Sequence, residues 1–227
     1  MKYPILLFDA DDTLFDFPAA SNLAFDVMCR ANDIPNTPVN HMRYCGINDG
    51  LWWAFARGEV TKEYLTLERY VRWLKALRLD RDPAKCNRDY IAALGQIIIP
   101  LPHAEEVCRE LAARGHRLFL VTNAVAAVQR SRLQLCPFGN LFEAAFISEE
   151  AGAAKPSAAY FDYVRAHVPE ISAENTLVIG DSLATDIRGA NNAGLPGCWA
   201  NFTNSPRPGQ PHIDYEIHDL RELLDIV

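Results

Sequence analysis

Short runs of apolar residues, each ending at polar or acidic residues, occur once at the start of the chain and repeatedly in its second half. Runs of this kind are typical of strands that are buried on both faces of a parallel sheet. The first run is residues 5–8, which ends at Asp9. The later runs lie at residues 117–121, 144–147, 176–179 and 197–200, with a weaker candidate at 215–217.

Segments with apolar residues at helical spacing alternate with these runs. They predict helices over residues 103–114, 124–135, 156–168, 184–193 and 219–226. Gly115 and Gly194 are suitable stops after two of them, and Pro156 suits the first position of a third. The alternation of strands and helices predicts an α/β fold built on a doubly wound parallel sheet.

Residues 17–96 break this alternation because they contain no clear strand. Their pattern predicts helices over residues 19–31, 41–57, 62–77 and 83–96. We therefore expect two domains. Residues 1–16 and 97–227 form the α/β core, and residues 17–96 form an inserted all-helical cap domain.

Composition narrows the classes of function. The 227 residues carry a formal net charge of −7, which argues against a nucleic acid polymer as partner, because phosphate backbones are bound by basic surfaces. No apolar stretch approaches the roughly 20 residues of a membrane span, so we expect no membrane partner. The six cysteines show no CxxC spacing, and scattered reduced thiols are typical of a cytoplasmic protein, although a disulfide set stays open. We expect a monomer or a small homo-oligomer.

Three acidic residues follow the predicted strands at the edge where ligands bind in open α/β sheets. Asp9 and Asp11 follow the first run, two positions apart, and Asp181 follows the fourth. Three converging carboxylates repel one another unless a cation lies among them. Mg²⁺ prefers oxygen ligands, so the pattern predicts a magnesium site.

Further polar residues at this edge are suited to phosphate. Thr122 and Asn123 follow the second run, and Lys155 precedes a predicted helix. A hydroxyl, backbone amides and an ammonium can bind phosphate oxygens. One carboxylate can act as a nucleophile while a second transfers protons. The set predicts phosphoryl transfer from a small phosphate ester.

These residues resemble, in order, the four motifs of the haloacid dehalogenase-like (HAD) superfamily. The matching positions are Asp9-Ala10-Asp11-Asp12-Thr13, Thr122, Lys155-Pro156, and Gly180-Asp181 with Asp186. The resemblance implies a HAD-type Rossmann-like core and an aspartyl-phosphate mechanism. It also implies the following roles: Asp9 as nucleophile, Asp11 as general acid/base, Thr122 and Lys155 as phosphate ligands, and Asp9, the backbone carbonyl of Asp11 and Asp181 as Mg²⁺ ligands, supported by Asp186.

Asp11 distinguishes phosphatases from dehalogenases within this superfamily. The first motif of dehalogenases resembles DxYGT and lacks the second acid. The helical insert is similar to the helical-bundle caps of one subclass. The sequence resembles the pyrimidine 5′-nucleotidase group of that subclass at residues 8–15, 147–156 and 191–194, and at Leu51-Trp52 and Cys198-Trp199. The resemblance implies a phosphatase, most specifically a 5′-nucleotidase acting on pyrimidine nucleoside monophosphates.

Three cap residues are candidates for substrate specificity. Trp52 could stack on a nucleobase, and Asn48 and Arg69 could make polar contacts. The alternatives are that the cap aromatic residues pack the helical bundle and that Asn48 and Arg69 are solvated or structural. A sugar-phosphate or phosphoglycolate phosphatase is the rival enzyme. A catalytically silent HAD binding or regulatory protein is one non-enzyme alternative, although it should have lost Asp9 or Asp11. A phosphoryl-receiver domain is another, although its phosphoacceptor would follow a later strand and it would lack the helical insert.

Overall fold

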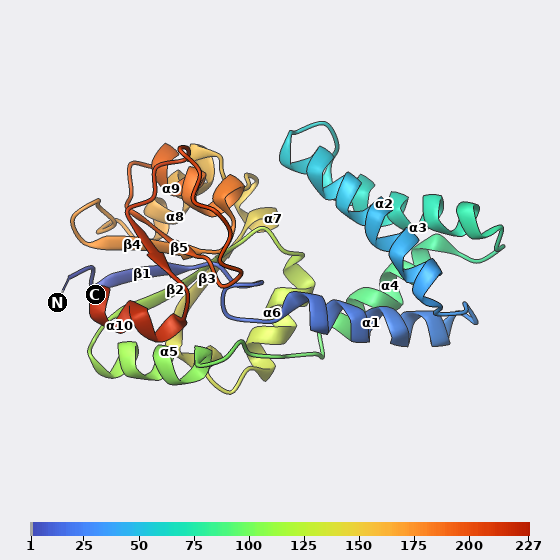
Figure 1. Cartoon of the computed structure of the whole chain (residues 1–227), viewed down its shortest axis with the longest axis horizontal. Coiled ribbons are helices and arrows are strands. Elements are labelled where there is room, and N and C mark those ends of the chain that lie inside the picture. Colours follow the sequence, from blue (N-terminus) through green and yellow to red (C-terminus); the bar gives the residue numbers. More distant parts are fainter. Residues whose placement is uncertain (1) are drawn as a thin grey trace. The chain divides into compact units, whose positions relative to one another are not determined.

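The computed structural model describes residues 2–227. It contains a six-stranded sheet in the order β3-β2-β1-β4-β5-β6, and every neighbouring pair is parallel (Figure 1). The strands are β1 Ile5–Phe8, β2 Arg117–Thr122, β3 Phe142–Ile147, β4 Thr176–Gly180, β5 Gly197–Ala200 and β6 Tyr215–Ile217. The predicted doubly wound parallel sheet is confirmed, and each strand begins or ends within about two residues of its predicted position.

The strand order reverses its direction at β1. From β1 the chain adds β2 and β3 on one side and then crosses to β4 on the other. β1 and β4 are paired from Ile5 opposite Thr176 to Phe8 opposite Ile179. Because the strands are parallel and in register, the residues that follow them leave the sheet together at the switch point, where open α/β sheets bind ligands.

Helices cover both faces of the sheet. α5 (Ala104–Ala113) and α10 (Leu223–Ile226) lie on one face, and α8 (Ala158–His167) and α9 (Arg188–Asn192) lie on the other (Figure 1). Side chains alternate between the two cores along β1: Leu6 and Phe8 pack with α5, whereas Ile5 and Leu7 pack with α8. Burial on both faces explains why β1 is apolar throughout.

Three helices after the strands differ from their predicted limits. The predicted helix over residues 219–226 is a 3₁₀ turn at Leu220–Glu222 followed by α10. The predicted helix from Pro156 begins instead at Ala158, after a cis peptide bond between Lys155 and Pro156. The predicted helix over residues 184–193 is a π-helical turn at Leu183–Ile187 followed by α9. Single π-helical turns are rare in proteins, but those that occur often lie at functional sites. α6 (Ala126–Leu135) matches its prediction closely, and a short α7 (Ser148–Ala151), which was not predicted, follows β3.

Contacts divide the chain into two compact units, Met1–Pro18 with Ile98–Val227, and Ala19–Ile97. The prediction placed the divisions after residues 16 and 96. The helices from the predicted insert are α1 Phe17–Ala31, α2 Pro38–Ala56, α3 Lys62–Leu77 and α4 Pro83–Leu94. An aromatic cluster forms the core of this helical unit, in which Phe25, Tyr44, Tyr70 and Trp73 pack with ring centroids 4.6–6.4 Å apart.

All six cysteines are free thiols, as the spacing predicted, and five of them are buried. Within residues 2–227, no helix combines the length and the hydropathy needed to cross a membrane.

Candidate active site

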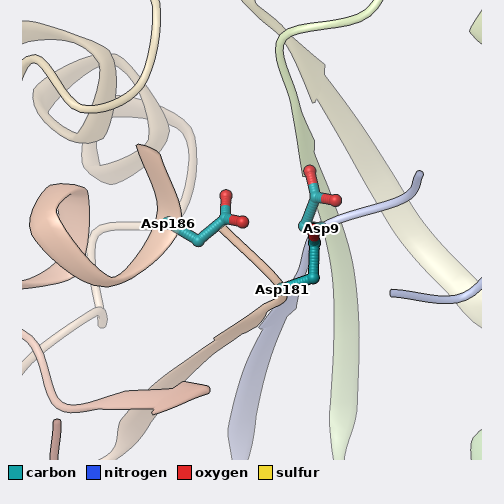
Figure 2. A group of neighbouring side chains, drawn as sticks. All are labelled: Asp9, Asp181 and Asp186. Carbon is teal, nitrogen blue, oxygen red and sulfur yellow. The ribbon is translucent and has the colours of Figure 1, made fainter. Parts of the chain in front are cut away.

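Carboxylates from three elements meet beyond the ends of β1 and β4. Asp9 follows β1, Asp181 follows β4, and Asp186 lies in the π-helical turn after β4. One carboxylate oxygen from each lies within 4.8 Å of the others, and the side chain of Asp186 points toward that of Asp9 (Figure 2). The strand pairing creates this proximity, because the Asp9 amide continues the ladder by donating to the carbonyl of Ile179 at 2.8 Å.

Lys155 connects two of these acids. Its ammonium donates to Asp9 Oδ1 and Asp186 Oδ1, both at 2.6 Å, and to the carbonyl oxygen of Val121 at 2.7 Å. These bonds use all three donors of the ammonium, so its position is held from three directions. Lys155 is buried, and this arrangement places a fixed positive charge beside Asp9.

Gly180 makes room for Asp186. A Cβ atom at position 180 would lie 2.4 Å from Asp186 Cγ and Oδ2, where no side chain can be accommodated without a shift. Asp186 is also held by the amide of Ser182, which donates to Oδ2 at 3.0 Å. Both carboxylate oxygens of Asp186 are therefore engaged within the protein.

Asp11 has a different environment from the one its spacing suggested. The chain turns directly after Asp9, where the amides of Leu14 and Phe15 both donate to the carbonyl of Ala10. The carboxylate of Asp11 accepts a hydrogen bond from Arg132 Nη1 at 2.5 Å. The third member of the carboxylate group is therefore Asp186 and not Asp11. The extended spacing of two residues does not continue through the turn, so it did not predict the direction of this side chain.

Thr122 and Asn123 lie where β2 ends, as predicted. Thr122 Oγ1 accepts from the amide of Ala124 at 3.1 Å, so its proton stays available to a ligand. The side chain of Asn123 forms two 2.9 Å hydrogen bonds with the backbone of Lys155, one from its amide and one to its carbonyl oxygen. The side chain of Asn123 is therefore engaged with the backbone of Lys155, and its role in phosphate binding stays a prediction.

Two further residues contact the predicted acids: Thr13, which belongs to the first motif but was given no separate role, and Arg132, which was not predicted. The hydroxyl of Thr13 is within 3.4 Å of Asp9 Oδ2 and accepts from the amide of Asp181 at 3.1 Å. Arg132, on α6, is fully buried. A signal for Arg132 was available, because it lies four residues after Val128 and three before Leu135, on the stripe that predicted the helix.

The charges at the site favour a bound cation. Burial raises the pKa of Asp9 despite the opposing effect of Lys155, and the neighbouring Asp186 raises it further. Burial also raises the pKa of Asp181, with Asp9 and Asp186 adding to the effect. The pKa of Lys155 is raised, because Asp186 and Asp9 outweigh its burial.

One ammonium thus faces three carboxylates, and a divalent cation would offset the remaining negative charge. Asp9 Oδ2 and the carboxylate of Asp181 have only long contacts with Thr13, at 3.4 and 3.5 Å, so they are the oxygens best able to hold it. Oxygen ligands of this kind suit Mg²⁺.

The three cap candidates have distinct environments within the helical unit. Arg69 is 4% exposed and donates to Asn48 Oδ1 and Asn87 Oδ1, both at 3.1 Å. It also lies over the rings of Tyr70 and Tyr90. Arg69 on α3 therefore links Asn48 on α2 to Asn87 on α4. These contacts match the alternative in which Arg69 and Asn48 have structural roles. Trp52 is half-buried and packs edge-on against Phe55.

The packing expected of the cap aromatic residues holds for some of them only. Tyr70 and Trp73 are fully buried, whereas Trp53 is 62% exposed and Tyr64 is 46% exposed. The helical pattern did not distinguish the two groups.

A carboxylate-lined site at the switch point of a doubly wound sheet, with a buried lysine at its centre, defines an α/β enzyme. The chain belongs to the haloacid dehalogenase-like hydrolase family, whose sequence profile matches residues 3–194. This match spans most of the α/β unit and the whole helical unit.

Full-length relatives support this assignment. The chain is 37% identical to the HAD-hydrolase YfnB of Bacillus subtilis, over 100% of this chain and 96% of YfnB. A crystal structure of YfnB bound to magnesium superimposes with a TM-score of 0.92, covering 100% and 99% of the two chains. The chain is also 33% identical to the pyrimidine 5′-nucleotidase YjjG of Escherichia coli, over 100% of this chain and 99% of YjjG. It is 31% identical to the pyrimidine 5′-nucleotidase PynA of Streptococcus pneumoniae, over 99% and 95%.

Proposed function

We propose that this protein is a Mg²⁺-dependent phosphatase that hydrolyses nucleoside 5′-monophosphates, pyrimidine nucleotides first, through an aspartyl-phosphate on Asp9. The observation that carries the proposal is the arrangement of Asp9, Lys155, Asp181 and Asp186 beyond β1 and β4. The presence of a second acid, Asp11, supports a phosphate ester rather than a haloacid as the substrate.

Asp9 is the proposed nucleophile because it is the carboxylate that Lys155 holds at the end of the central strand. Its oxygen attacks phosphorus as the bond from phosphorus to the ester oxygen breaks. Asp11 gives its proton to the departing oxygen. It then accepts a proton from the water that hydrolyses the aspartyl-phosphate and returns the site to its starting state.

Positive charge and hydrogen-bond donors stabilise the phosphoryl group during transfer. Since its three donors are used within the protein, Lys155 contributes mainly by its charge. The hydroxyl of Thr122 donates to a phosphoryl oxygen. A Mg²⁺ ion held by Asp9, Asp181 and, as the resemblance implies, the backbone carbonyl of Asp11 would supply further charge neutralisation. Asp186 and Asn123 keep Lys155 in position.

The choice of nucleotides rests on the two full-length relatives that are pyrimidine 5′-nucleotidases. The motif residues alone do not report on the leaving group, so the substrate is a separate part of the proposal. Trp52 remains the candidate for base recognition.

The test is a phosphatase screen in Mg²⁺ that compares kcat/KM for UMP, CMP, dTMP, AMP and GMP with that for glucose 6-phosphate and phosphoglycolate. We expect the pyrimidine monophosphates to rank first. Asp9→Asn is the control that excludes a contaminating phosphatase. A ranking led by phosphoglycolate or a hexose phosphate would reject the nucleotidase assignment and leave the phosphatase intact. Turnover of none of these esters would reject both.

A further inference from the structure

Arg132 is a buried cation that pairs with Asp11. It is fully buried on α6, and its Nη1 atom donates to Asp11 Oδ1 at 2.5 Å and to Gln129 Oε1 at 3.3 Å. Its guanidinium carbon lies 4.8 Å from the ring centroid of Phe15. Among residues 2–227, Arg132 is the one side chain that donates a hydrogen bond to the carboxylate of Asp11.

The hydrogen bonding of Arg132 is incomplete for a residue whose role is stability. Its Nε and Nη2 atoms are buried and have no hydrogen-bond partner within the described chain. Buried donors are normally paired, and an unpaired one costs free energy. An apolar side chain of similar size is often at least as stable as a buried ion pair. Stability alone therefore does not explain a buried arginine at this position, and its ion pair with Asp11 is the reason that remains.

The two members of the pair differ in their access to solvent. The side chain of Arg132 is 1% exposed, whereas that of Asp11 is 22% exposed. The guanidinium therefore holds Asp11 from the protein interior while the carboxyl group remains accessible. Oδ1 is occupied by Arg132, so Oδ2 is the oxygen that can carry a proton toward a substrate.

We propose that Arg132 is a positioning residue for the general acid/base Asp11: it binds Oδ1 and thereby presents Oδ2 as the proton-carrying oxygen. This inference rests on the proposed phosphatase mechanism. When Asp11 is protonated, Oδ1 is the carbonyl oxygen that accepts from Arg132, and the Oδ2 hydroxyl gives its proton to the leaving oxygen. When Asp11 is ionised, Oδ2 accepts the proton of the attacking water.

The experiment compares phenyl phosphate with p-nitrophenyl phosphate. The two esters have similar shapes, but phenolate is the more basic leaving group and needs protonation, whereas p-nitrophenolate needs little. kcat/KM reports on the steps up to departure of the phenol, so the ratio of the two kcat/KM values measures the contribution of the general acid. Arg132→Met removes the charge and keeps most of the side-chain volume beside Phe15.

We expect Arg132→Met to lower kcat/KM for phenyl phosphate about 10- to 100-fold, part of the 10²- to 10⁴-fold typical of proton transfer, and for p-nitrophenyl phosphate about 3-fold or less. Arg132→Lys should recover part of the loss, because an ammonium can still reach toward Oδ1. In an Asp11→Asn background, Arg132→Met should not change the ratio further. Arg130→Met is the matched control on the same helix, since Arg130 is exposed and pairs with Glu150 at 2.5 Å.

A merely structural role predicts a different result. Equal losses on both esters, or a ratio that changes in the Asp11→Asn background, would overturn the positioning role. If Arg132→Met fails to fold, Arg132→Lys alone provides the test. Reduced activity of Arg132→Lys with a wild-type ratio of the two kcat/KM values would also reject the positioning role. A ratio that Asp11→Asn leaves unchanged would refute the acid role of Asp11, which is a failure of the proposed mechanism, and the inference about Arg132 would fall with it.

Discussion

Replacing Gly180 with alanine tests how closely the site is packed around Asp186. The added Cβ would lie 2.4 Å from Asp186 Cγ and Oδ2, whereas carbon atoms in contact are about 3.5 Å apart. One group must therefore move by about 1 Å. Asp186 cannot move freely, because it is 1% exposed and is held by Lys155 Nζ at 2.6 Å and by the amide of Ser182 at 3.0 Å.

The molecule has two ways to relieve this overlap. A 1 Å displacement of Asp186 would break both hydrogen bonds, and hydrogen bonds to charged groups contribute about 1.5–3 kcal/mol each. A shift of the backbone in an overpacked core costs about 1–3 kcal/mol. The cheaper route sets the cost, so we expect Gly180→Ala to lower the free energy of unfolding by about 1–3 kcal/mol. At about 2–4 °C per kcal/mol for a chain of this size, the melting temperature should fall by about 2–12 °C.

Urea unfolding and thermal melting measure this effect, and kcat/KM should fall as well, since Lys155 is disturbed with Asp186. Gly46→Ala is the matched control. Gly46 lies in α2, is exposed, and its added Cβ would meet nothing within 4 Å. An alanine there should be stabilising by up to about 1 kcal/mol, because glycine is a poor helix former. A free energy of unfolding for Gly180→Ala within about 0.5 kcal/mol of wild type, below the low end of the overpacking cost, would refute the reasoning.

Four further predictions follow from the described contacts. Asp9→Asn should abolish turnover without unfolding the protein, since an amide is a poor nucleophile; activity within about tenfold of wild type would contradict the covalent mechanism. EDTA should remove activity and Mg²⁺ restore it, with Ca²⁺ a poor substitute because of its looser coordination; full activity in metal-free protein would exclude the metal. Arg69→Met should lower the free energy of unfolding by about 1–3 kcal/mol, because Asn48 and Asn87 each lose their hydrogen bond to its guanidinium; an unchanged urea midpoint would argue against its structural role. Trp52→Ala should lower kcat/KM for UMP by about 5- to 150-fold relative to p-nitrophenyl phosphate if the ring stacks on the base, and equal losses on both would reject stacking.

The local pattern of the sequence was sufficient to predict the strands of the sheet and the residues that lie at its edge. Buried parallel strands are apolar throughout, so their limits can be read from the chain, and parallel strands end at one edge. That is why Asp9, Thr122 and Asp181 can be placed together from the order of the residues alone. The helical insert is recognisable for the same reason, because residues 17–96 lack such runs.

Only the tertiary structure decided where the side chains at that edge point. Asp11 turns to Arg132, a residue 121 positions away, and Asp186 joins Asp9 through Lys155. Arg69 was a candidate for substrate contact, yet its partners Asn48 and Asn87 come from two other helices. The direction of a polar side chain depends on which donors and acceptors packing brings near it. Those partners are distant in sequence, so periodicity and spacing do not show which donors and acceptors meet.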